Sequence, residues 1–238
     1  MRASAFWLWL PLVLLSPPWA SAEDNGPAAI CDRLAADPFA GFGPKNWDKP
    51  FQDVDAAHAV PACEEAMRLH PDQPRYRLEA AVAYLAADDR GRATPLLEGL
   101  VAEGDAAAMV LLANVLSDKG SIELIRKAAA LNNTAALIFL AFAHLTGDGA
   151  EQNVLEGIRL LTRAADLGNT EAMIILAGVY LEGQFGVPPD PAEGRRLILE
   201  AATRGNPSAM NALARIERAQ AAASARPPSM GPIKPTKP

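Results

Sequence analysis

The sequence predicts an all-α fold, built as a stack of helical hairpins. Half of its 238 residues are apolar, and that half is rich in Ala and Leu and poor in aromatic and β-branched runs. Such a composition favours packed helices over sheet. Four short junctions combine a helix-terminating residue with a helix-capping residue, and two different apolar patterns recur around them with shared spacing, which indicates repeated helix pairs.

Each junction pairs a residue suited to the end of one helix with a residue suited to the start of the next. Gly or Asn stands where a helix C-terminus favours left-handed backbone. Asp or Asn follows, where a side-chain oxygen can accept hydrogen bonds from the free N–H groups of the next helix. The four junctions are Glu103-Gly104-Asp105, Leu131-Asn132-Asn133, Leu167-Gly168-Asn169 and Arg204-Gly205-Asn206.

The helices on the two sides of each junction carry different apolar patterns. Downstream helices show one stripe with i, i+3, i+4, i+7 spacing, and upstream helices show two apolar pairs four residues apart. A single long Ala-rich bundle would explain the stripes, but it would not explain why the two patterns advance by the same 28, 36 and 37 residues. These steps run through Ala113, Ala141, Ala177 and Ala214 in the first pattern and through Leu97, Ile125, Leu161 and Ile198 in the second.

Two further helices are expected before the repeats, separated by a segment rich in Pro and Gly. The first covers Ala28–Ala36, and the second covers Val54–Leu69 with Asp53 as its N-cap. Pro61 falls inside the second helix, so it either kinks this helix or sets its start near Val60.

The first 22 residues predict a cleavable secretory signal peptide. Arg2 supplies the positive charge, an apolar run extends from Phe6 to Leu15, and Ala20-Ser21-Ala22 forms a small-x-small cleavage site. The alternative is an uncleaved anchor, but the run has about half of the roughly 20 apolar residues that a spanning helix needs. We therefore expect a periplasmic or secreted protein, cleaved after Ala22 and without a later membrane span.

The two cysteines, Cys31 and Cys63, are expected to form a disulfide, because export leads to an oxidising compartment. The bridge would close a loop of about 33 residues and stabilise the fold by roughly 3–4 kcal/mol. The alternative is a metal site that also uses His58 and His70. Their offsets from Cys63 are irregular and lack paired ligand spacing, so no metal site is predicted.

Charge is distributed unevenly along the chain. The net charge is −6, and it becomes −7 without Arg2 and −10 when the tail over residues 224–238 is also set aside. The tail carries Arg226, Lys234 and Lys237 and no acidic residue, so an acidic body precedes a weakly basic tail. The acidic body lacks the clustered positive charge that is typical of nucleic-acid-binding proteins. Because the tail also holds five prolines, we expect it to be disordered or extended.

From about residue 74 to residue 218 the units resemble the Sel1-like repeat family, a relative of the tetratricopeptide repeat. The match is strongest from Ala172 to Asn206, and the preceding unit departs from the family by having His144 where Tyr is usual. The resemblance implies a right-handed α-solenoid. It depends on the repeat-defining residues Ala113, Ala141, Ala177, Ala214, Tyr180, Gly147, Gly183, Gly186, Gly168 and Gly205.

The segment around the two cysteines resembles the leader module of some exported bacterial repeat proteins, which implies a disulfide-linked helical cap on the solenoid. The expected organisation is a signal peptide over 1–22, an N-terminal helical cap over 23–73, a Sel1/TPR-like solenoid over 74–223 and a Pro-rich tail over 224–238.

Three residues or loops have a structural and a functional interpretation. His144 is expected to be a partly buried helix residue, and the alternative is a ligand contact or a pH sensor. Residues 147–151 lack the ligands of a calcium loop and are expected to form a turn. Phe185 is expected to pack into the repeat interface, and the alternative is contact with a partner.

The sequence predicts that the protein is not an enzyme and has no cofactor. It contains no H-E-x-x-H, G-x-S-x-G, phosphate-loop or S-x-x-K motif. The resemblance implies an exported scaffold or regulator that binds protein partners in the periplasm or cell envelope, without a residue-level prediction of the binding site. The alternatives are an exported hydrolase acting on cell-wall or antibiotic substrates and a structural envelope stress protein.

Overall fold

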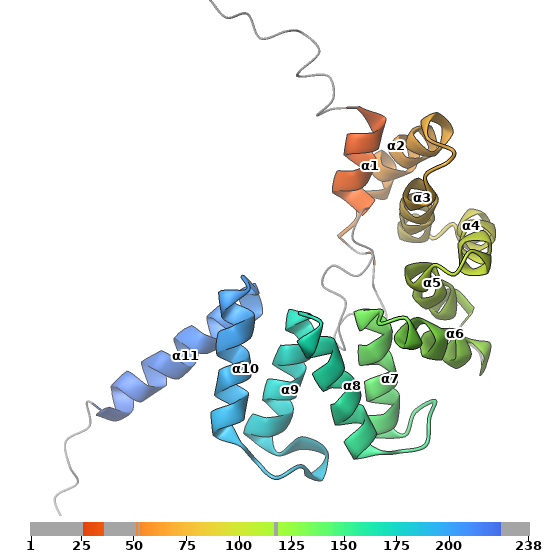
Figure 1. Cartoon of the computed structure of the whole chain (residues 1–238). Coiled ribbons are helices and arrows are strands. Elements are labelled where there is room, and N and C mark those ends of the chain that lie inside the picture. Colours follow the sequence, from red (N-terminus) through yellow and green to blue (C-terminus); the bar gives the residue numbers. More distant parts are fainter. Residues whose placement is uncertain (1–25, 36–50, 52, 117–118, 225–238) are drawn as a thin grey trace, which may run out of the picture. The chain divides into compact units, whose positions relative to one another are not determined.

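The computed structural model describes residues 26–35, 51, 53–116 and 119–224, and every regular element in these ranges is a helix, so the all-α prediction is confirmed (Figure 1). The predicted signal peptide, the Pro- and Gly-rich break and nearly all of the tail lie outside these residues. The helices are α1 (Pro27–Ala35), α2 (Ala56–Leu69), α3 (Pro74–Ala86), α4 (Arg90–Ala102), α5 (Ala106–Leu116), α6 (Lys119–Ala130), α7 (Thr134–Thr146), α8 (Val154–Asp166), α9 (Thr170–Glu182), the 3-10 turn η2 (Gln184–Gly186), α10 (Pro191–Thr203) and α11 (Pro207–Ser224).

The described residues fall into two compact units that divide within α4, after Leu96. The first unit holds α1, α2, α3 and the start of α4. The second holds the end of α4 and the helices from α5 to α11. None of the described helices is long and apolar enough to cross a membrane.

In the first unit, α1 and α2 are joined by the predicted disulfide between Cys31 and Cys63. Both residues are fully buried, and their Cα atoms are 4.8 Å apart. Both helices also contact α3. The bridge therefore links two cysteines that are 32 residues apart in the sequence and holds α1 against α2.

The start of α2 differs from the sequence prediction. The helix begins at Ala56 and is capped by Asp55, whose side chain accepts a hydrogen bond from the backbone N–H of His58, so the assignment of Asp53 as the cap is wrong. Pro61 lies within the helix and does not set its start. A proline at this position removes the hydrogen bond to the carbonyl of Ala57, a residue that is exposed, where water can replace the missing donor.

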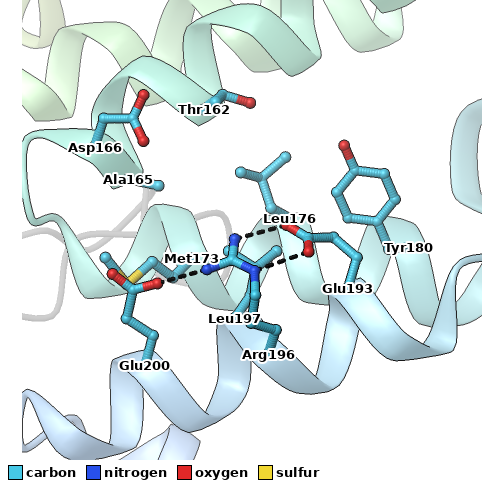
Figure 2. Close-up of a pocket in the computed structure, with 10 residues that line it drawn as sticks. All are labelled: Thr162, Ala165, Asp166, Met173, Leu176, Tyr180, Glu193, Arg196, Leu197 and Glu200. Carbon is cyan, nitrogen blue, oxygen red and sulfur yellow. Dashed lines mark hydrogen bonds and ion pairs between the residues drawn. The ribbon is translucent and has the colours of Figure 1, made fainter.

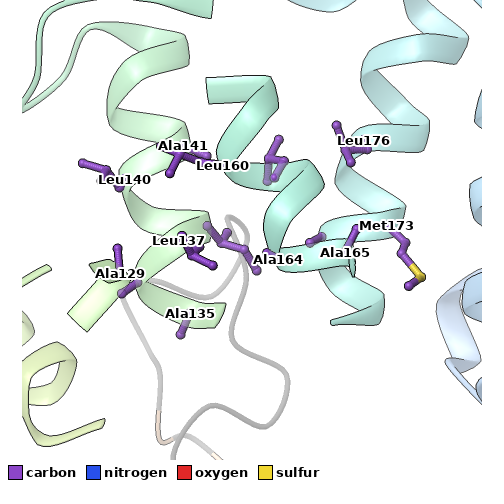
Figure 3. Close-up of a cluster of buried hydrophobic side chains, with 14 of the residues drawn as sticks. Ala129, Ala135, Leu137, Leu140, Ala141, Leu160, Ala164, Ala165, Met173 and Leu176 are labelled. Carbon is purple, nitrogen blue, oxygen red and sulfur yellow. The ribbon is translucent and has the colours of Figure 1, made fainter. Parts of the chain in front are cut away.

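The second unit is built from three hairpins, α5 with α6, α7 with α8 and α9 with α10, followed by α11. Both apolar patterns of the sequence converge between these helices (Figure 3). Leu137 and Met173, from the stripes of α7 and α9, are at most 1% exposed, as is Leu161 from the apolar pairs of α8. The shared steps of the two patterns thus correspond to one continuous core.

The final helix, α11, repeats the stripe of α5, α7 and α9 without the same burial. Met210 is 54% exposed, whereas Met173 at the equivalent position of α9 is 1% exposed. In the earlier hairpins a second helix follows and covers this stripe. No helix follows α11 within the described residues, so its apolar stripe remains partly uncovered.

Two glycines that the sequence analysis did not single out set the closest helix approaches of the second unit. A Cβ atom on Gly194 of α10 would lie 2.6 Å from Leu181 Cγ and 3.1 Å from the carbonyl oxygen of Ala177 in α9. Gly157 of α8 has the same relation to α7, with Leu145 Cγ at 2.6 Å from the added Cβ. A side chain at either position would push the paired helices apart.

We expect Gly194→Ala to lower the free energy of unfolding by about 1–3 kcal/mol, because the added methyl group overlaps Leu181 and the α9 backbone. Gly178→Ala in α9 is the matched control, since a Cβ there meets nothing within 4 Å. This control should raise stability by roughly 0.5–1 kcal/mol, because Gly is a poor helix former. Urea unfolding of both variants measures the difference, and equal effects of the two substitutions would contradict the close approach.

Candidate partner-binding groove

Left-handed residues end the second helix of each hairpin and begin the turn to the next. Gly104, Gly168 and Gly205 have φ of 90°, 92° and 85°, and Asn132 has φ of 65°. In each case the following Asp or Asn donates its backbone N–H to a carbonyl five residues earlier, as in Asn169 to Ala164 at 3.1 Å. This pattern closes the helix end, because it satisfies carbonyls that have no partner within the helix.

The same capping residues start the next helix and connect successive hairpins. The Asn169 side chain accepts a hydrogen bond from the backbone N–H of Ala172 at 2.9 Å, and its Nδ2 donates to Thr134 Oγ1 at 2.9 Å. Asn206 Nδ2 donates in the same way to Thr170 Oγ1, also at 2.9 Å. One asparagine thus caps its own helix and bonds to the first residue of the equivalent helix one unit earlier.

The loops within the last two hairpins are also closed by equivalent hydrogen bonds. The N-caps of α8 and α10, Asn153 and Asp190, donate their backbone N–H groups to the carbonyls of His144 and Tyr180, both at 2.8 Å. His144 is partly buried, as expected, and its Nδ1 donates to the carbonyl of Glu151 at 2.9 Å. The histidine therefore holds the loop over residues 147–153.

The repeat-defining residues named from the sequence divide into core and loop positions. Ala113, Ala141 and Ala177 are at most 3% exposed, whereas Ala214 in the uncovered stripe of α11 is exposed. Gly147 and Gly183 end α7 and α9 in the left-handed conformation, and Gly186 has φ of 76°.

The expectation that Phe185 packs into the repeat interface is wrong. Its side chain is 37% exposed, and its backbone is held in the left-handed region at φ of 55°, within the short turn η2.

A cavity of about 250 Å³, which we call the α8–α10 groove, opens in the second unit where α8, α9 and α10 meet (Figure 2). Its floor is formed by Met173 and Leu176 of α9 and Leu197 of α10, which are nearly fully buried. Polar side chains surround this floor. The lining residues are Thr162, Ala165, Asp166, Met173, Leu176, Tyr180, Glu193, Arg196, Leu197 and Glu200.

The guanidinium group of Arg196 is already engaged along α10. Its Nη2 is 2.6 Å from Glu193 Oε1, and its Nη1 is 2.9 Å from Glu200 Oε2. The hydrogen bond from Arg196 lowers the pKa of Glu193, and Glu193 in turn raises the pKa of Arg196. The Asp166 carboxylate and the Tyr180 hydroxyl, by contrast, have no hydrogen-bond or ion-pair partner among the described residues.

The equivalent surface one unit earlier carries the opposite charge. The Glu156–Arg159 pair of α8 occupies the register of Glu193–Arg196, with Arg159 Nη2 2.5 Å from Glu156 Oε1. The other charged positions differ, because Arg126, Ala130 and Arg163 replace Thr162, Asp166 and Glu200. The lining charge is therefore negative at the α8–α10 groove and positive at the preceding position. This contrast was not predicted from the sequence, although the shared steps between units align the positions that carry it.

A second polar cluster lies beside the disulfide in the first unit. Glu79 of α3 is 5% exposed, and its Oε2 is 3.0 Å from Cys31 Sγ. A disulfide sulfur carries no proton, so a hydrogen bond at this distance needs a protonated Glu79. Burial raises the pKa of Glu79 to about 7, and the charge of Asp32 and a hydrogen bond with it add to this effect, whereas Arg75 acts in the opposite direction.

Cys31, Cys63 and Glu79 lie close enough to form a metal-ligand set, but the chemistry of the donors does not fit one. Their ligand atoms are all within 4.8 Å of one another. However, both sulfurs belong to the disulfide and are not thiolates. The histidines of the metal alternative lie elsewhere: His58 contacts Asp55 at 2.7 Å, and His70 stacks on Tyr76 with ring centroids 5.1 Å apart.

Glu79 predicts a specific pH dependence of stability. Because its pKa rises from 4.5 in the unfolded chain to about 7 in the fold, its stabilising contribution is complete below pH 4.5 and is lost as the pH rises through 7. Glu79→Gln keeps the neutral hydrogen-bonding group at every pH. We expect urea unfolding between pH 5 and 8, with the disulfide intact, to show a smaller fall in stability for this variant than for the wild type.

The matched control for this experiment is Glu98→Gln, because Glu98 is exposed. The slope of stability against pH in this control should follow the wild type. If Glu79→Gln and the wild type lose stability equally over the same pH range, Glu79 does not bind its proton more tightly in the fold.

The geometry agrees with comparisons to known proteins. The family model described as Sel1 repeat matches residues 134–169 and 170–206. A Sel1 repeat protein from Oxalobacter formigenes has a similar structure, with a TM-score of 0.54 and 19% identity over 84% of this chain and 80% of that chain. No curated protein sequence matches the chain.

A second solved structure is c5321, a protective antigen present in uropathogenic Escherichia coli strains that displays an SLR fold. It matches with a TM-score of 0.56 and 22% identity over 84% of this chain and 43% of that chain. The chain thus spans less than half the length of c5321. At these identities the two structures show the shared solenoid fold.

Proposed function

Because the chain is a member of the Sel1-like repeat proteins, we propose that it is a non-catalytic scaffold that binds a protein partner through the α8–α10 groove. Sel1 repeats generally mediate protein–protein interactions and are generally not enzymes. The proposal further places the protein in the periplasm or cell envelope. The support for this location is the leader over residues 1–22, with its single charge, apolar run and small-x-small site.

The observation that carries the proposal is the α8–α10 groove itself. Binding sites combine an apolar surface with a few polar groups that orient the ligand. Here Met173, Leu176 and Leu197 supply the apolar floor, while Asp166 and the Tyr180 hydroxyl are left without partners in the fold. The helices that carry these groups are held by caps and close packing, so the site is preformed. A side chain of an extended partner segment fits a cavity of this size.

A photo-crosslinking amino acid placed at Thr162, on the rim of the α8–α10 groove, is expected to give a discrete adduct with the partner in the native host. The same group at Leu199, which is exposed on α10 but does not line the groove, is the matched control. In the protein with the probe at Thr162, the further substitution Tyr180→Ala should lower the yield of the adduct, because it removes the phenol from the groove wall. Mass spectrometry of the crosslinked species identifies the partner.

Identical adducts from the two probe positions would contradict binding at the groove. So would an adduct at Thr162 whose yield is unchanged by Tyr180→Ala. Circular dichroism of each variant checks that the helical fold persists.

The proposed location is tested by Leu12→Arg, which places a charge in the apolar run of the leader. We expect the wild type to be recovered from the envelope fraction with an intact mass that begins at Glu23. The variant should accumulate as an uncleaved precursor, because signal recognition needs an uninterrupted apolar segment. Recovery of wild-type protein that still begins at Met1 would contradict the proposed cleavage.

A further inference from the structure

We propose that residues 225–238, the basic Pro-rich segment that follows α11, occupy the α8–α10 groove of the same chain and compete there with the partner. The occupation of the groove stands on its own observations, and the competition rests on the proposed function. We call residues 225–238 the basic segment.

Charge complementarity is the first observation. Three carboxylates and one guanidinium line the α8–α10 groove, so its net charge is −2. The basic segment carries Arg226, Lys234 and Lys237 and no acidic residue. The body of the protein is acidic as well, so these three cations oppose its overall charge.

The position of Asp166 strengthens the attraction for a cation. This residue ends α8, where the helix dipole places partial negative charge, so an unneutralised carboxylate there is unfavourable. Glu200 lies in the last turn of α10 and shares its charge with Arg196 and Arg204. Asp166 has no such partner among the described residues. A lysine ammonium group bound beside it would relieve the repulsion between the carboxylate and the end of α8.

The apolar floor of the α8–α10 groove matches the other residues of the basic segment. Met173, Leu176 and Leu197 form this floor. The basic segment supplies Met230 and Ile233 between its cations, together with five prolines. Proline restricts the unfolded chain towards extended conformations, which lowers the entropy lost when such a segment binds. Because the floor side chains are nearly fully buried, charge pairing supplies the main attraction and apolar contact adds to it.

The length of the basic segment is sufficient. The 18 residues of α11 make a helix about 27 Å long, and α11 packs against α10, one wall of the α8–α10 groove. The end of α11 thus lies within about 37 Å of α10, allowing roughly 10 Å between the two helix axes. The 14 residues from 225 to 238 span up to about 46 Å when extended. Lys237, the last cation of the basic segment, spans up to about 43 Å from Ser224, so it can reach α10, one wall of the groove, within one chain.

The charge contrast between units makes this position selective. One unit earlier, the register-equivalent positions hold Arg126, Arg159 and Arg163 with Glu156, and their net positive charge repels a cationic segment. Among these two register-equivalent surfaces, the basic segment therefore favours the α8–α10 groove. Intramolecular attachment raises its effective concentration there to the millimolar range, so that weak contacts suffice for occupancy.

The test uses the full chain labelled with ¹³C at the methionine methyl groups. Met173 reports on the floor of the groove, Met230 reports on the basic segment, and Met109 in α5 is an internal control. The variant Arg226→Gln/Lys234→Gln/Lys237→Gln removes the three cations and keeps the chain length. We expect the Met173 and Met230 signals to shift between wild type and variant at low salt, and the Met109 signal to stay unchanged. About 1 M salt should abolish the difference, because charges are then screened within ~3 Å.

A synthetic peptide of residues 225–238 then tests binding in trans. Added to the charge-neutralised variant, it should move the Met173 signal saturably towards its wild-type position. Adding Asp166→Asn to this variant should weaken binding of the peptide by about 2- to 5-fold, as expected for one exposed charge pair. Asp166→Asn is a mild probe, because this carboxylate holds no other side chain in place.

Two results would overturn the inference. The first is a Met173 signal that is identical in the wild type and the charge-neutralised variant at low salt. The second is equal binding of an unrelated cationic peptide to the wild type and to the variant, which would show that the groove is free for external segments. The proposed function is judged separately by the Thr162 crosslink. We expect that crosslink to increase in the charge-neutralised variant, and its loss on Tyr180→Ala would stand even if the basic segment does not occupy the groove.

Discussion

The second unit depends on one local device, a left-handed residue followed by a capping Asp or Asn. The left-handed residue ends a helix, and the next side chain starts the following helix within one residue, so little freedom remains in the angle between them. Asn169 and Asn206 add a bond to Thr134 and Thr170 of the preceding unit. Each of these asparagines bonds to its own helix three residues later and to a threonine about one repeat earlier. The same residue therefore caps a helix and fixes it against the preceding unit.

Because caps and small residues maintain the stack, the exposed charges are free to differ between units. Gly157 and Gly194 allow the same close approach in two successive hairpins, and the Glu–Arg pairs of α8 and α10 keep the same register. Of the other three positions, one loses a positive charge, one gains a negative charge and one changes from Arg163 to Glu200. The close helix approach and the caps thus do not depend on the charged side chains of the groove wall, which allows one architecture to present chemically different surfaces one unit apart.

Much of this architecture is predictable because its signals are local. The junction residues and the apolar stripes act within one or two helical turns, and the disulfide was expected from two cysteines together with a predicted export signal. The start of α2 was mispredicted because Asp53 and Asp55 both suit a cap, and the sequence does not show which of them bonds to the first turn, as Asp55 does to His58. Gly194 and the groove depend on contacts between helices, and the exposure of Phe185 depends on an unusual backbone angle. Periodicity within one helix carries no information about these features.

The uncovered stripe of α11 has a consequence for how such proteins change in length. Met210 is exposed at the position where Met173 is buried one unit earlier. The last described helix therefore exposes the kind of face that the second helix of a hairpin covers in the earlier units. Nearest-neighbour contacts supply most of the stability of a repeat array, and a further unit would need no new kind of interface. Duplication of a segment such as 170–206 would extend the array in register, and the exposed face of α11 is thus a point at which evolution can add units without redesigning those that exist.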